Sequence, residues 1–366
     1  MNLEHFLKSD GPSWLEVKGS DADIVMSTRI RLARNLVGYR FPLSFDEQEA
    51  KQIDQVVTQA LLNRNNGDHF FSHFTIKEMP ALQRQILVEK HLISPLLAKK
   101  EKSASVVISN DESISVMVNE EDHLRIQCLS PGFQLYETYE LANQLDRYLE
   151  KHIPYAFEES FGYLTSCPTN VGTGLRASVM VHLPALTMSK QMKAIIQTLT
   201  RLGMVVRGIY GEGSENLGNI YQISNQITLG KSEEEILNDL QNVVEQIIQN
   251  ERNARQLIMQ QAPIALEDRI QRSLGTLKYA RIMTSEEAAS CLSNVRLGID
   301  LNIIKDVPLS ILNECMILIQ QGFVQQYAGT TLQATERDLF RAKLLREKLN
   351  AKTKNSVEKG EEKYDV

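Results

Sequence analysis

The sequence predicts an α+β fold, with an antiparallel sheet flanked by helices and an all-α domain after it. Strand-like segments near 104–129, 176–183, 203–210 and 219–229 follow one another too closely for regular βαβ crossovers. From Gly230 to about residue 350, apolar residues recur with helical spacing only. The chain has 366 residues, more than one hydrophobic core usually serves, so we expect two domains.

The first domain combines a meander with separate helices. Residues 104–129 contain three short apolar strands joined by polar turns, a pattern typical of an antiparallel meander. Helical periodicity predicts helices near 44–63, 134–151 and 189–202. Ser44 and Glu47 have capping-box spacing at the start of the first of these helices.

The second domain is expected to be helical throughout. Ser232 and Glu235 form another capping box, which opens a helical pattern that runs to about Gln261, where Pro263 interrupts it. Further helices are expected near 266–281, 284–297, 308–321 and 335–349. We therefore predict an α+β domain over 1–254, a helical domain over 255–350 and a charged tail over 351–366 that is expected to be disordered.

Composition narrows the possible functions. The net charge of −6 provides no global basic field, so we expect no direct binding to nucleic acid or to anionic lipid. Neither a run of about eighteen apolar residues nor a signal peptide is apparent, which indicates a cytoplasmic protein. The four cysteines lack C-x-x-C spacing, which argues against a zinc site and against a disulfide framework.

The segment "STRIRLARN", residues 27–35, suggests an anion site. Arg29 and Arg31 alternate around Ile30 and therefore emerge on one face of an extended segment. Paired guanidinium groups suit a polyphosphate, because each group offers two charge-assisted hydrogen bonds to phosphate oxygens. A basic surface strand that forms ion pairs is the alternative, and spacing alone does not distinguish the two.

Two further segments supply carboxylates. "NEEDHLRIQ", residues 119–127, places three acids in a tight turn before Arg125, although such turns are usually solvated hairpin ends. "VRGIYGEGSE", residues 206–215, surrounds Glu212 with glycines that allow close approach of a ligand. Phosphoryl transfer needs cations around the phosphates and another group to align the nucleophile. Two acids would suit a planar guanidinium as that nucleophile, so the sequence predicts an ATP:guanidino phosphotransferase.

These segments, together with "CPTNVGTGLRA" at 167–177, resemble the signature segments of the phosphagen kinases, in the same order. The resemblance implies ATP as the phosphoryl donor, with Mg²⁺ held mainly by the nucleotide and no metal site on the protein. It implies catalytic roles for Glu121, Glu212 and Cys167, with the glutamates holding the acceptor guanidinium and the thiol nearby. It assigns nucleotide binding to Ser27, Thr28, Arg29, Arg31, His91, Arg125, Arg176, Ala177, Ser178, Val179, Met180, Arg207, Gly208, Ile209, Tyr210 and Gly211.

The chain also departs from the phosphagen kinases that act on small guanidines. Those enzymes carry a helical domain with a closing loop before the first arginine motif, whereas only 26 residues precede Ser27 here. We therefore expect an open pocket, which suits a guanidinium presented on a protein side chain. The helical C-terminal domain is likewise foreign to those enzymes.

In these features the chain is similar to the bacterial protein arginine kinases (McsB type). That similarity implies phosphorylation of exposed arginines in target proteins, which marks them for Clp-type degradation in the stress response. The implied partners are a zinc-finger activator (McsA type), a heat-shock repressor (CtsR type) and a Clp unfoldase (ClpC type). In "RDLFRA", residues 337–342, Arg337, Asp338 and Arg341 would bind phosphoarginine as an allosteric ligand.

For the reaction, one glutamate must accept a proton from the acceptor guanidinium, whose pKa is about 13.8. We favour Glu121 as this base and Glu212 for positioning. Two other functions stay open: a kinase of free arginine or another small guanidine, and a catalytically inactive adaptor that binds repressor or protease partners. The helical appendage also makes a homodimer the expected assembly.

Overall fold

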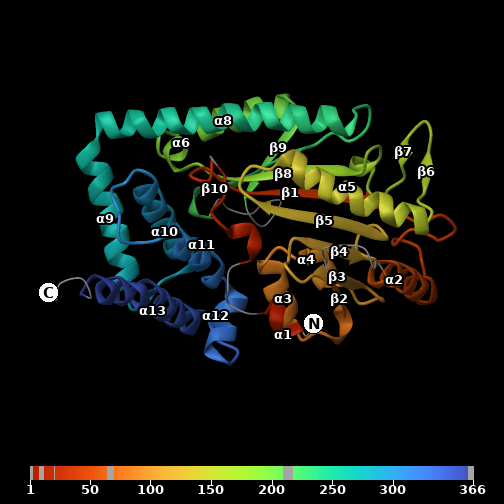
Figure 1. Ribbon diagram of the computed structural model, residues 1–366, viewed down its shortest axis with the longest axis horizontal. Helices are drawn as coiled ribbons and strands as arrows, with labels where there is room; N and C mark the ends of the chain where they lie inside the picture. The colour runs from red at the N-terminus through yellow and green to blue at the C-terminus, as the bar shows by residue number, and fades with distance from the viewer. Residues whose placement is uncertain (1–2, 8–11, 20, 64–69, 209–216, 362–366) are drawn as a thin grey trace.

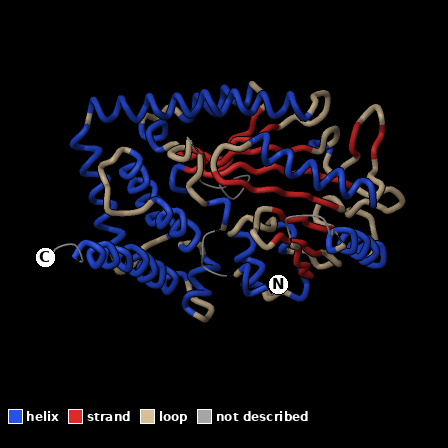
Figure 2. Tube along the Cα trace, viewed as in Figure 1, coloured by secondary structure: helices blue, strands red, loops and turns tan. Residues whose placement is uncertain are grey.

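The structure, a computed structural model, describes residues 3–7, 12–19, 21–63, 70–208 and 217–361. A sheet with its covering helices forms one half of the molecule, and a helical region forms the other (Figures 1 and 2). Helix α8 (Glu233–Gln261) runs along the top of Figure 1 from the first half to the second. No helix in the described part of the chain is both long enough and apolar enough to cross a membrane.

The sheet has eight strands in the order β2-β3-β4-β5-β1-β8-β10-β9. Every neighbouring pair is antiparallel, which confirms the predicted sheet and the meander β3-β4-β5 within it. Strands β6 (Phe157–Glu158) and β7 (Gly162–Tyr163) form a separate ribbon. The eight strands are β1 (Val25–Arg34), β2 (Phe71–Thr75), β3 (Ser105–Ser109), β4 (Ile114–Val118), β5 (Leu124–Pro131), β8 (Leu175–His182), β9 (Met204–Gly208) and β10 (Ile220–Asn225).

One face of the sheet carries the main hydrophobic core. Ile30, Ile126 and Val179 point to this face from three adjacent strands, and each is fully buried. Helices α2 (Glu47–Leu62), α5 (Leu135–His152) and the first part of α8 pack against them. Because side chains alternate along a strand, the residues between these apolar positions must point to the opposite face.

Shorter elements cover the opposite face at its two ends. Helices α3 (Ala81–Glu89) and α4 (Pro95–Ala98) pack over β3 and β4 in a core that includes Val106 and Met117. The short helix η1 (Ser13–Leu15) and helices α11 (Leu309–Leu318) and α12 (Gln321–Ala328) pack near Leu129 and Met180. The remaining helices of the first half are α1 (Leu3–Phe6), α6 (Pro184–Met188) and α7 (Met192–Arg201).

The predicted capping box at Ser44 and Glu47 is wrong by two residues. Asp46 is the N-cap of α2 and accepts hydrogen bonds from the backbone N–H groups of Gln48 and Glu49. The Glu49 side chain in turn accepts a hydrogen bond from the backbone N–H of Asp46. Both pairs have the required spacing, and the carboxylate of Asp46 is the stronger acceptor for the partly positive helix N-terminus.

The helical half has its own core, centred on Leu292, Leu312 and Leu345. The capping box of Ser232 and Glu235 is confirmed, and Pro263 occupies the first turn of α9, where its missing N–H costs nothing. The helix predicted at 308–321 is α11, which ends at Leu318, and the short helix α12 that follows from Gln321 was not predicted. The other helices are α9 (Pro263–Tyr279), α10 (Ser285–Asp300) and α13 (Ala334–Glu361), the last of which covers part of the predicted tail.

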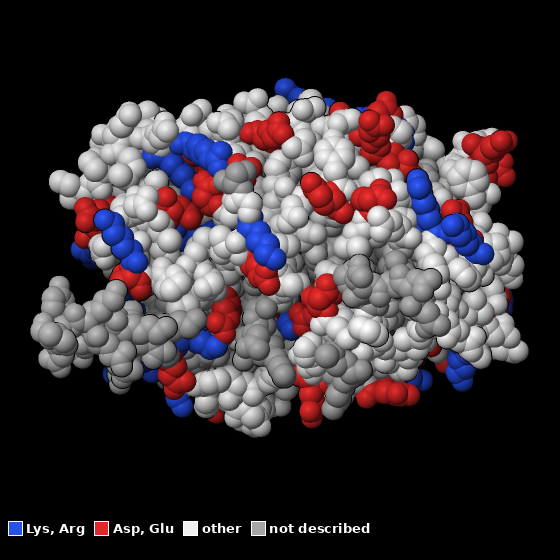
Figure 3. Space-filling model, in the orientation of Figure 1, with Lys and Arg blue, Asp and Glu red and all other residues white. Residues whose placement is uncertain are grey.

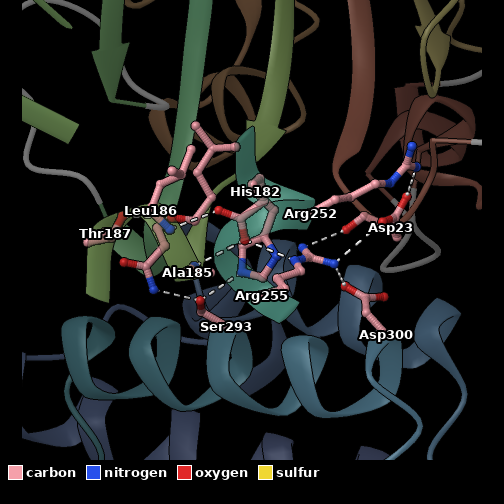
Figure 4. Close-up of polar contacts among 12 residues, drawn as sticks. Asp23, His182, Ala185, Leu186, Thr187, Arg252, Arg255, Ser293 and Asp300 are labelled. Carbon is pink, nitrogen blue, oxygen red and sulfur yellow. Dashed lines mark hydrogen bonds and ion pairs between the residues drawn. The ribbon is translucent and has the colours of Figure 1, made fainter. Parts of the chain in front are cut away.

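The two cores meet along a seam of polar contacts, in which Asp23, Arg252, Arg255 and Asp300 are seen in Figure 4. Asp21, which pairs with Arg252, and Arg296, which donates to the Ala22 carbonyl, also belong to the seam. Arg255 donates to Glu251 at 2.9 Å and lies 3.4–3.5 Å from Asp300 and Asp23. His182, at the end of β8, lies 2.8 Å from Ser293 on α10, which also accepts a hydrogen bond from Asn219. The helical half is therefore joined to the sheet by specific buried polar contacts.

Charges of both signs are mixed over the surface. Figure 3 shows acidic and basic side chains interspersed on the face in view. This distribution agrees with the small net charge of −6.

Candidate active site

Strand register brings the predicted arginines together on the face opposite the main core. Arg31 pairs with Gln127 of β5 on one side and with Arg176 of β8 on the other. Directly paired residues point to the same face, as do residues two apart on one strand. The same counting places five arginines from four strands on this face: Arg29, Arg31, Arg125, Arg176 and Arg207.

Four of these side chains, those of Arg29, Arg31, Arg125 and Arg207, line a cavity of about 130 Å³. Its walls come from the sheet, from the end of α3 and from the start of α4. Arg29 donates a hydrogen bond to Gln222 of β10 across it, and the Gln127 side chain donates to the His91 carbonyl at 2.7 Å. The lining residues are Arg29, Arg31, Val88, His91, Ile93, Ser94, Pro95, Met117, Arg125, Gln127, Arg207 and Gln222.

Positive charge is concentrated in the cavity. Burial, followed by the charges of Arg125 and Arg176, lowers the pKa of Arg29 to about 10. Burial and the neighbouring arginines also lower the pKa of Arg31. Arg31 Nε has no hydrogen-bond partner among the residues that the structure describes. Such an arrangement is costly until an anion enters, so the cavity suits a phosphate-bearing ligand.

His91 follows α3 in a left-handed backbone conformation, with φ of 59°. Burial, together with the charges of Arg29 and Arg31, lowers the pKa of its imidazole to about 3. The ring contacts Trp14 edge-on, with 5.2 Å between ring centroids. His91 therefore presents a neutral ring to the cavity at physiological pH.

Two carboxylates of the acidic turn, Glu120 and Glu121, contact the same arginine but differ in exposure. Arg125 forms ion pairs with Glu120 at 2.7 Å and with Glu121 at 2.8 Å. Glu120 is fully buried and also accepts a hydrogen bond from Ser94, the N-cap of α4. The Glu121 side chain remains 36% exposed, so of these two it is the one that an outside ligand can reach.

Asp122 joins this turn to the loop that carries Cys167. Asp122 is fully buried and accepts hydrogen bonds from the backbone N–H of Ser166 at 2.6 Å and from the Asn35 side chain at 2.7 Å. Because Ser166 and Cys167 are consecutive, the thiol is held close to the turn that carries Glu121. The Cys167 thiol is partly exposed and lies 3.0 Å from the Thr169 hydroxyl.

Two glycines explain the bend between Cys167 and β8. Gly172 has φ of +109°, and a Cβ there would lie 2.2 Å from the Thr228 carbonyl oxygen. Gly174 has φ of +63°, and a Cβ would lie 2.6 Å from the Ala33 carbonyl oxygen. Only glycine fits both positions, so the loop can lie flat against its neighbours before Arg176 enters β8.

The other predicted nucleotide residues fall into three groups. Ser27, Ser178 and Met180 line a small cavity that shares Arg29, His91 and Gln222 with the main one. The side chains of Thr28, Ala177 and Val179 point to the other face and are fully buried, so only their backbone could contact a ligand. Gly208 ends β9 next to Arg207. The predicted residues Ile209, Tyr210, Gly211 and Glu212 lie outside the described residues.

The three residues of the predicted phosphoarginine site on α13, Arg337, Asp338 and Arg341, differ in their exposure to solvent. Arg341 is only 3% exposed, and its guanidinium donates to the carbonyls of Ile319 and Met283 and to Asp338. Arg337 and Asp338 are half-buried. Arg337 donates to the Leu332 carbonyl at 2.9 Å. Asp338 and Arg337 are thus the members of the trio that solvent reaches best.

Two residues near the motifs have structural roles. Arg34 is buried and forms a bidentate contact with Asp146, so it belongs to the core side of the sheet. His123 accepts a hydrogen bond from the Leu36 backbone N–H at Nδ1, donates one from Nε2 to the Arg40 carbonyl, and supports the hairpin.

Sequence reasoning missed several polar residues of the site: Ser94, Glu120, Gln127 and Gln222. Gln127 pairs with Arg31 and Gln222 pairs with Arg207, so both glutamines point to the same face as the arginines. Strand alternation could have identified them once the register was known. Ser94 is the N-cap of α4 and precedes Glu120 by 26 residues, so no local sequence pattern connects the two.

The sequence is similar to two known family models and to proteins of known function. Residues 52–254 match the family model of the ATP:guanido phosphotransferase C-terminal catalytic domain, and residues 263–360 match that of the protein-arginine kinase McsB C-terminal domain. The chain is 54% identical over 359 residues to a protein-arginine kinase of Geobacillus stearothermophilus, covering 98% of this chain and 99% of that one. A protein-arginine kinase of Bacillus cereus is 54% identical over 351 residues, covering 96% and 99% of the two chains.

Solved structures extend the similarity to the fold. The duplicated taurocyamine kinase of Schistosoma mansoni, with bound transition state analog components, aligns with a TM-score of 0.59 and 26% identity, over 68% of this chain and 36% of that longer chain. Lombricine kinase aligns with a TM-score of 0.58 and 26% identity, over 67% of this chain and 70% of the other. The predicted phosphagen-kinase-like fold is confirmed. The chain therefore belongs to the ATP:guanido phosphotransferase family and, within it, to the protein-arginine kinases.

Proposed function

We propose that this protein transfers the γ-phosphoryl group of ATP to arginine side chains of target proteins. The observation that carries the proposal is that five strand arginines share one face of the sheet and four of them line one cavity beside the hairpin that holds Glu121. Relatives 54% identical over nearly the whole chain are protein-arginine kinases, which supports a protein acceptor.

The arginine set fits a nucleoside triphosphate. Arg29, Arg31, Arg125, Arg176 and Arg207 would hold the phosphates, and their mutual repulsion would be relieved by the ligand's negative charge. Carboxylates near the cavity are engaged by Arg125 and Ser94. Mg²⁺ would therefore be held mainly by the nucleotide itself and would neutralise developing charge on the phosphates.

Glu121, Cys167 and Glu212 would form the acceptor side. A guanidinium has a pKa of about 13.8 and must lose a proton to become a nucleophile. The partly exposed carboxylate of Glu121 would accept that proton while the guanidinium nitrogen bonds to the γ-phosphorus and the bond to the ADP oxygen breaks. Because the transition state is largely dissociative, positioning and charge should supply most of the rate.

Regulation and partners form the finer part of the proposal. We propose that Arg337 and Asp338 contact a phosphoarginine ligand, with Arg341 holding the helix that carries them. By resemblance to the McsB-type kinases we also propose that phosphorylated targets are marked for Clp-type degradation, with a zinc-finger activator, a heat-shock repressor and a Clp unfoldase as partners. Ile264, Tyr279 and Ile282 are exposed on and after α9 and would supply an apolar face for a homodimer.

Intact-mass spectrometry at neutral pH tests the activity. The protein is mixed with Mg-ATP and an unfolded arginine-rich protein, and we expect mass gains in phosphate steps that localise to arginine and disappear after brief acid treatment. Glu121→Gln should abolish most of the labelling, whereas Glu137→Gln, an exposed change on α5, should not. Labelling of free arginine alone would indicate a small-guanidine kinase, and no labelling at all would favour an inactive adaptor.

A further inference from the structure

A second concave surface adjoins the cavity, on the other side of α4. This α3–α4 groove encloses about 510 Å³ and is lined by Ala81, Arg84, Gln85, Val88, Pro95, Ala98, Lys99, Lys100 and Glu101. Three of these side chains are cationic and one is anionic. None of them is among the residues assigned above to nucleotide or acceptor binding.

The cations of the groove have few partners within the protein. Arg84 donates from one Nη to the Ala98 carbonyl at 2.8 Å, while its Nε is buried without a partner among the described residues. The ammonium groups of Lys99 and Lys100 form no hydrogen bond or ion pair with any residue in the described ranges. Buried or clustered donors of this kind favour an anionic ligand.

The groove adjoins the cavity and lies near the hairpin that carries Glu121. Val88 and Pro95 line both the cavity and the groove. Ser94, at the start of α4, donates a hydrogen bond to Glu120, the neighbour of Glu121. Lys100 lies close enough for the charges of Glu120 and Glu121 to act on it. A polypeptide whose arginine reaches Glu121 would therefore pass beside Lys99 and Lys100.

We propose that the α3–α4 groove binds the polypeptide next to the acceptor arginine and selects acidic residues there. This inference rests on the proposed function, because it names a specificity site for the same reaction. Charge complementarity identifies the occupant: three cations facing one carboxylate suit aspartate or glutamate side chains. The nucleotide phosphates have their own cations on the sheet, and none of these sheet arginines lines the groove.

Such a site would help the acceptor arginine to approach the cavity. The acceptor arginine is cationic, and the cavity that it approaches is rich in arginine. An acidic neighbour in the substrate would offset this repulsion and slow dissociation of the substrate chain. Targets would then be distinguished by the residues flanking the arginine rather than by the arginine alone.

Three peptides test the proposal, each with one arginine flanked on both sides by Asp, by Asn or by Lys. Phosphoarginine formation is measured for each, and the wild-type kcat/KM should favour the Asp peptide over the Asn peptide by about tenfold at low salt. The preference should shrink in 0.5 M NaCl, at which the Debye length is only about 4 Å. The Lys peptide should be the poorest substrate.

Charge reversal gives the decisive comparison. In a Lys99→Glu, Lys100→Glu double variant, the Lys peptide should overtake the Asp peptide, and in Lys99→Gln, Lys100→Gln the preference should fall toward one. Lys193→Glu, an exposed lysine on α7 at the other edge of the sheet, should keep the wild-type order. ATP-induced thermal stabilisation of each variant checks that it is folded.

The outcomes separate the two levels of the proposal. Equal kcat/KM for the Asp and Asn peptides in the wild type, or an unchanged order in both double variants, would overturn the groove assignment and leave the kinase activity standing. If the wild type phosphorylates none of the peptides and no protein arginine, the proposed function fails, and the groove assignment fails with it.

Discussion

The cavity and the seam both contain clustered arginines, but the two clusters are compensated differently. In the seam, Arg252 lies 2.9 Å from both Asp21 and Asp23, and Arg255 contacts Glu251 and Asp300. In the cavity, the charges of neighbouring arginines lower the pKa values of both Arg29 and Arg31. The protein therefore neutralises the seam arginines internally, whereas the charges of Arg29 and Arg31 in the cavity favour an anionic ligand.

This difference separates stability from function. Removing a seam arginine leaves a buried carboxylate without its cation, which lowers the free energy of unfolding. Removing a cavity arginine relieves repulsion in the empty protein but deletes a contact to the transferred phosphoryl group. The two clusters should thus respond in opposite ways to the same substitution.

The largest expected effect is on catalysis. Arg31→Ala should lower kcat/KM on the order of 10³-fold, as loss of a phosphoryl-transfer arginine does elsewhere. Its free energy of unfolding without nucleotide should change by no more than about 1 kcal/mol, since mutual repulsion is removed along with packing. Steady-state kinetics and urea unfolding, followed by fluorescence of the single tryptophan Trp14, give both values. Arg147→Ala, an exposed change on α5, is the matched control, and wild-type kinetics for Arg31→Ala would remove Arg31 from the site.

The second prediction concerns the seam. Arg255→Met should lower the free energy of unfolding by about 3–5 kcal/mol, because Glu251 and Asp300 remain buried without their cation. The turnover of the folded fraction should be retained. Arg252→Met removes a more exposed pair and should cost less than about 1 kcal/mol. Equal costs for the two variants would contradict the idea that burial sets the strength of the seam.

The third prediction is a pH effect. Burial raises the pKa of Asp300 to about 6, although Arg296 and Arg255 oppose the shift. The unfolded value is about 3.9, so the folded protein binds the extra proton between pH 4 and 6. This contribution therefore reduces stability as pH rises through that window, and its full cost, on the order of 3 kcal/mol, is present above pH 6.

Asp300→Asn should remove this slope. Urea unfolding at several pH values between 4 and 6.5 measures it as the difference between the variant and the wild type. Asp306→Asn, at a side chain that is 59% exposed, should preserve the wild-type slope. A variant curve parallel to the wild type would show that Asp300 does not titrate in this range.

The smallest effect is expected at Ser293. Ser293→Ala removes the hydrogen-bond partner of both His182 and Asn219 and should cost about 1–2 kcal/mol of unfolding free energy. Ser290→Ala, on the exposed side of the same helix, should change it by less than about 0.5 kcal/mol. Chemical denaturation distinguishes these values, and a Ser293 variant as stable as the Ser290 variant would make the contact dispensable.

Much of the fold was accessible from local patterns. Alternation predicted the meander and the exposed side of β1, where Arg29 and Arg31 do lie on one face. Helical periodicity predicted α5, α8 and α10 to within a few residues. Helices α5 and α8 alternate buried and exposed residues with helical spacing, so their period dominates any competing local preference.

The rest depended on contacts between distant parts of the chain. Sequence spacing could not select Asp46 over Ser44 as the cap of α2, because both have an acid three residues later. Nor could it show that Ser94 donates a hydrogen bond to Glu120, or that Arg29 of β1 donates one to Gln222 of β10 across the intervening strand β8. Register is set when the whole sheet assembles, and these partners are brought together only then.

Helix α8 has a consequence for how the protein unfolds. Its first turns contribute Leu237 and Val244 to the core of the sheet, while Ile258, near its end, packs against both cores. A helix shared in this way cannot stay packed on one side after the other has melted. The two halves should therefore lose their structure cooperatively, in one calorimetric transition, although the main core of the sheet and that of the helical half are separate clusters.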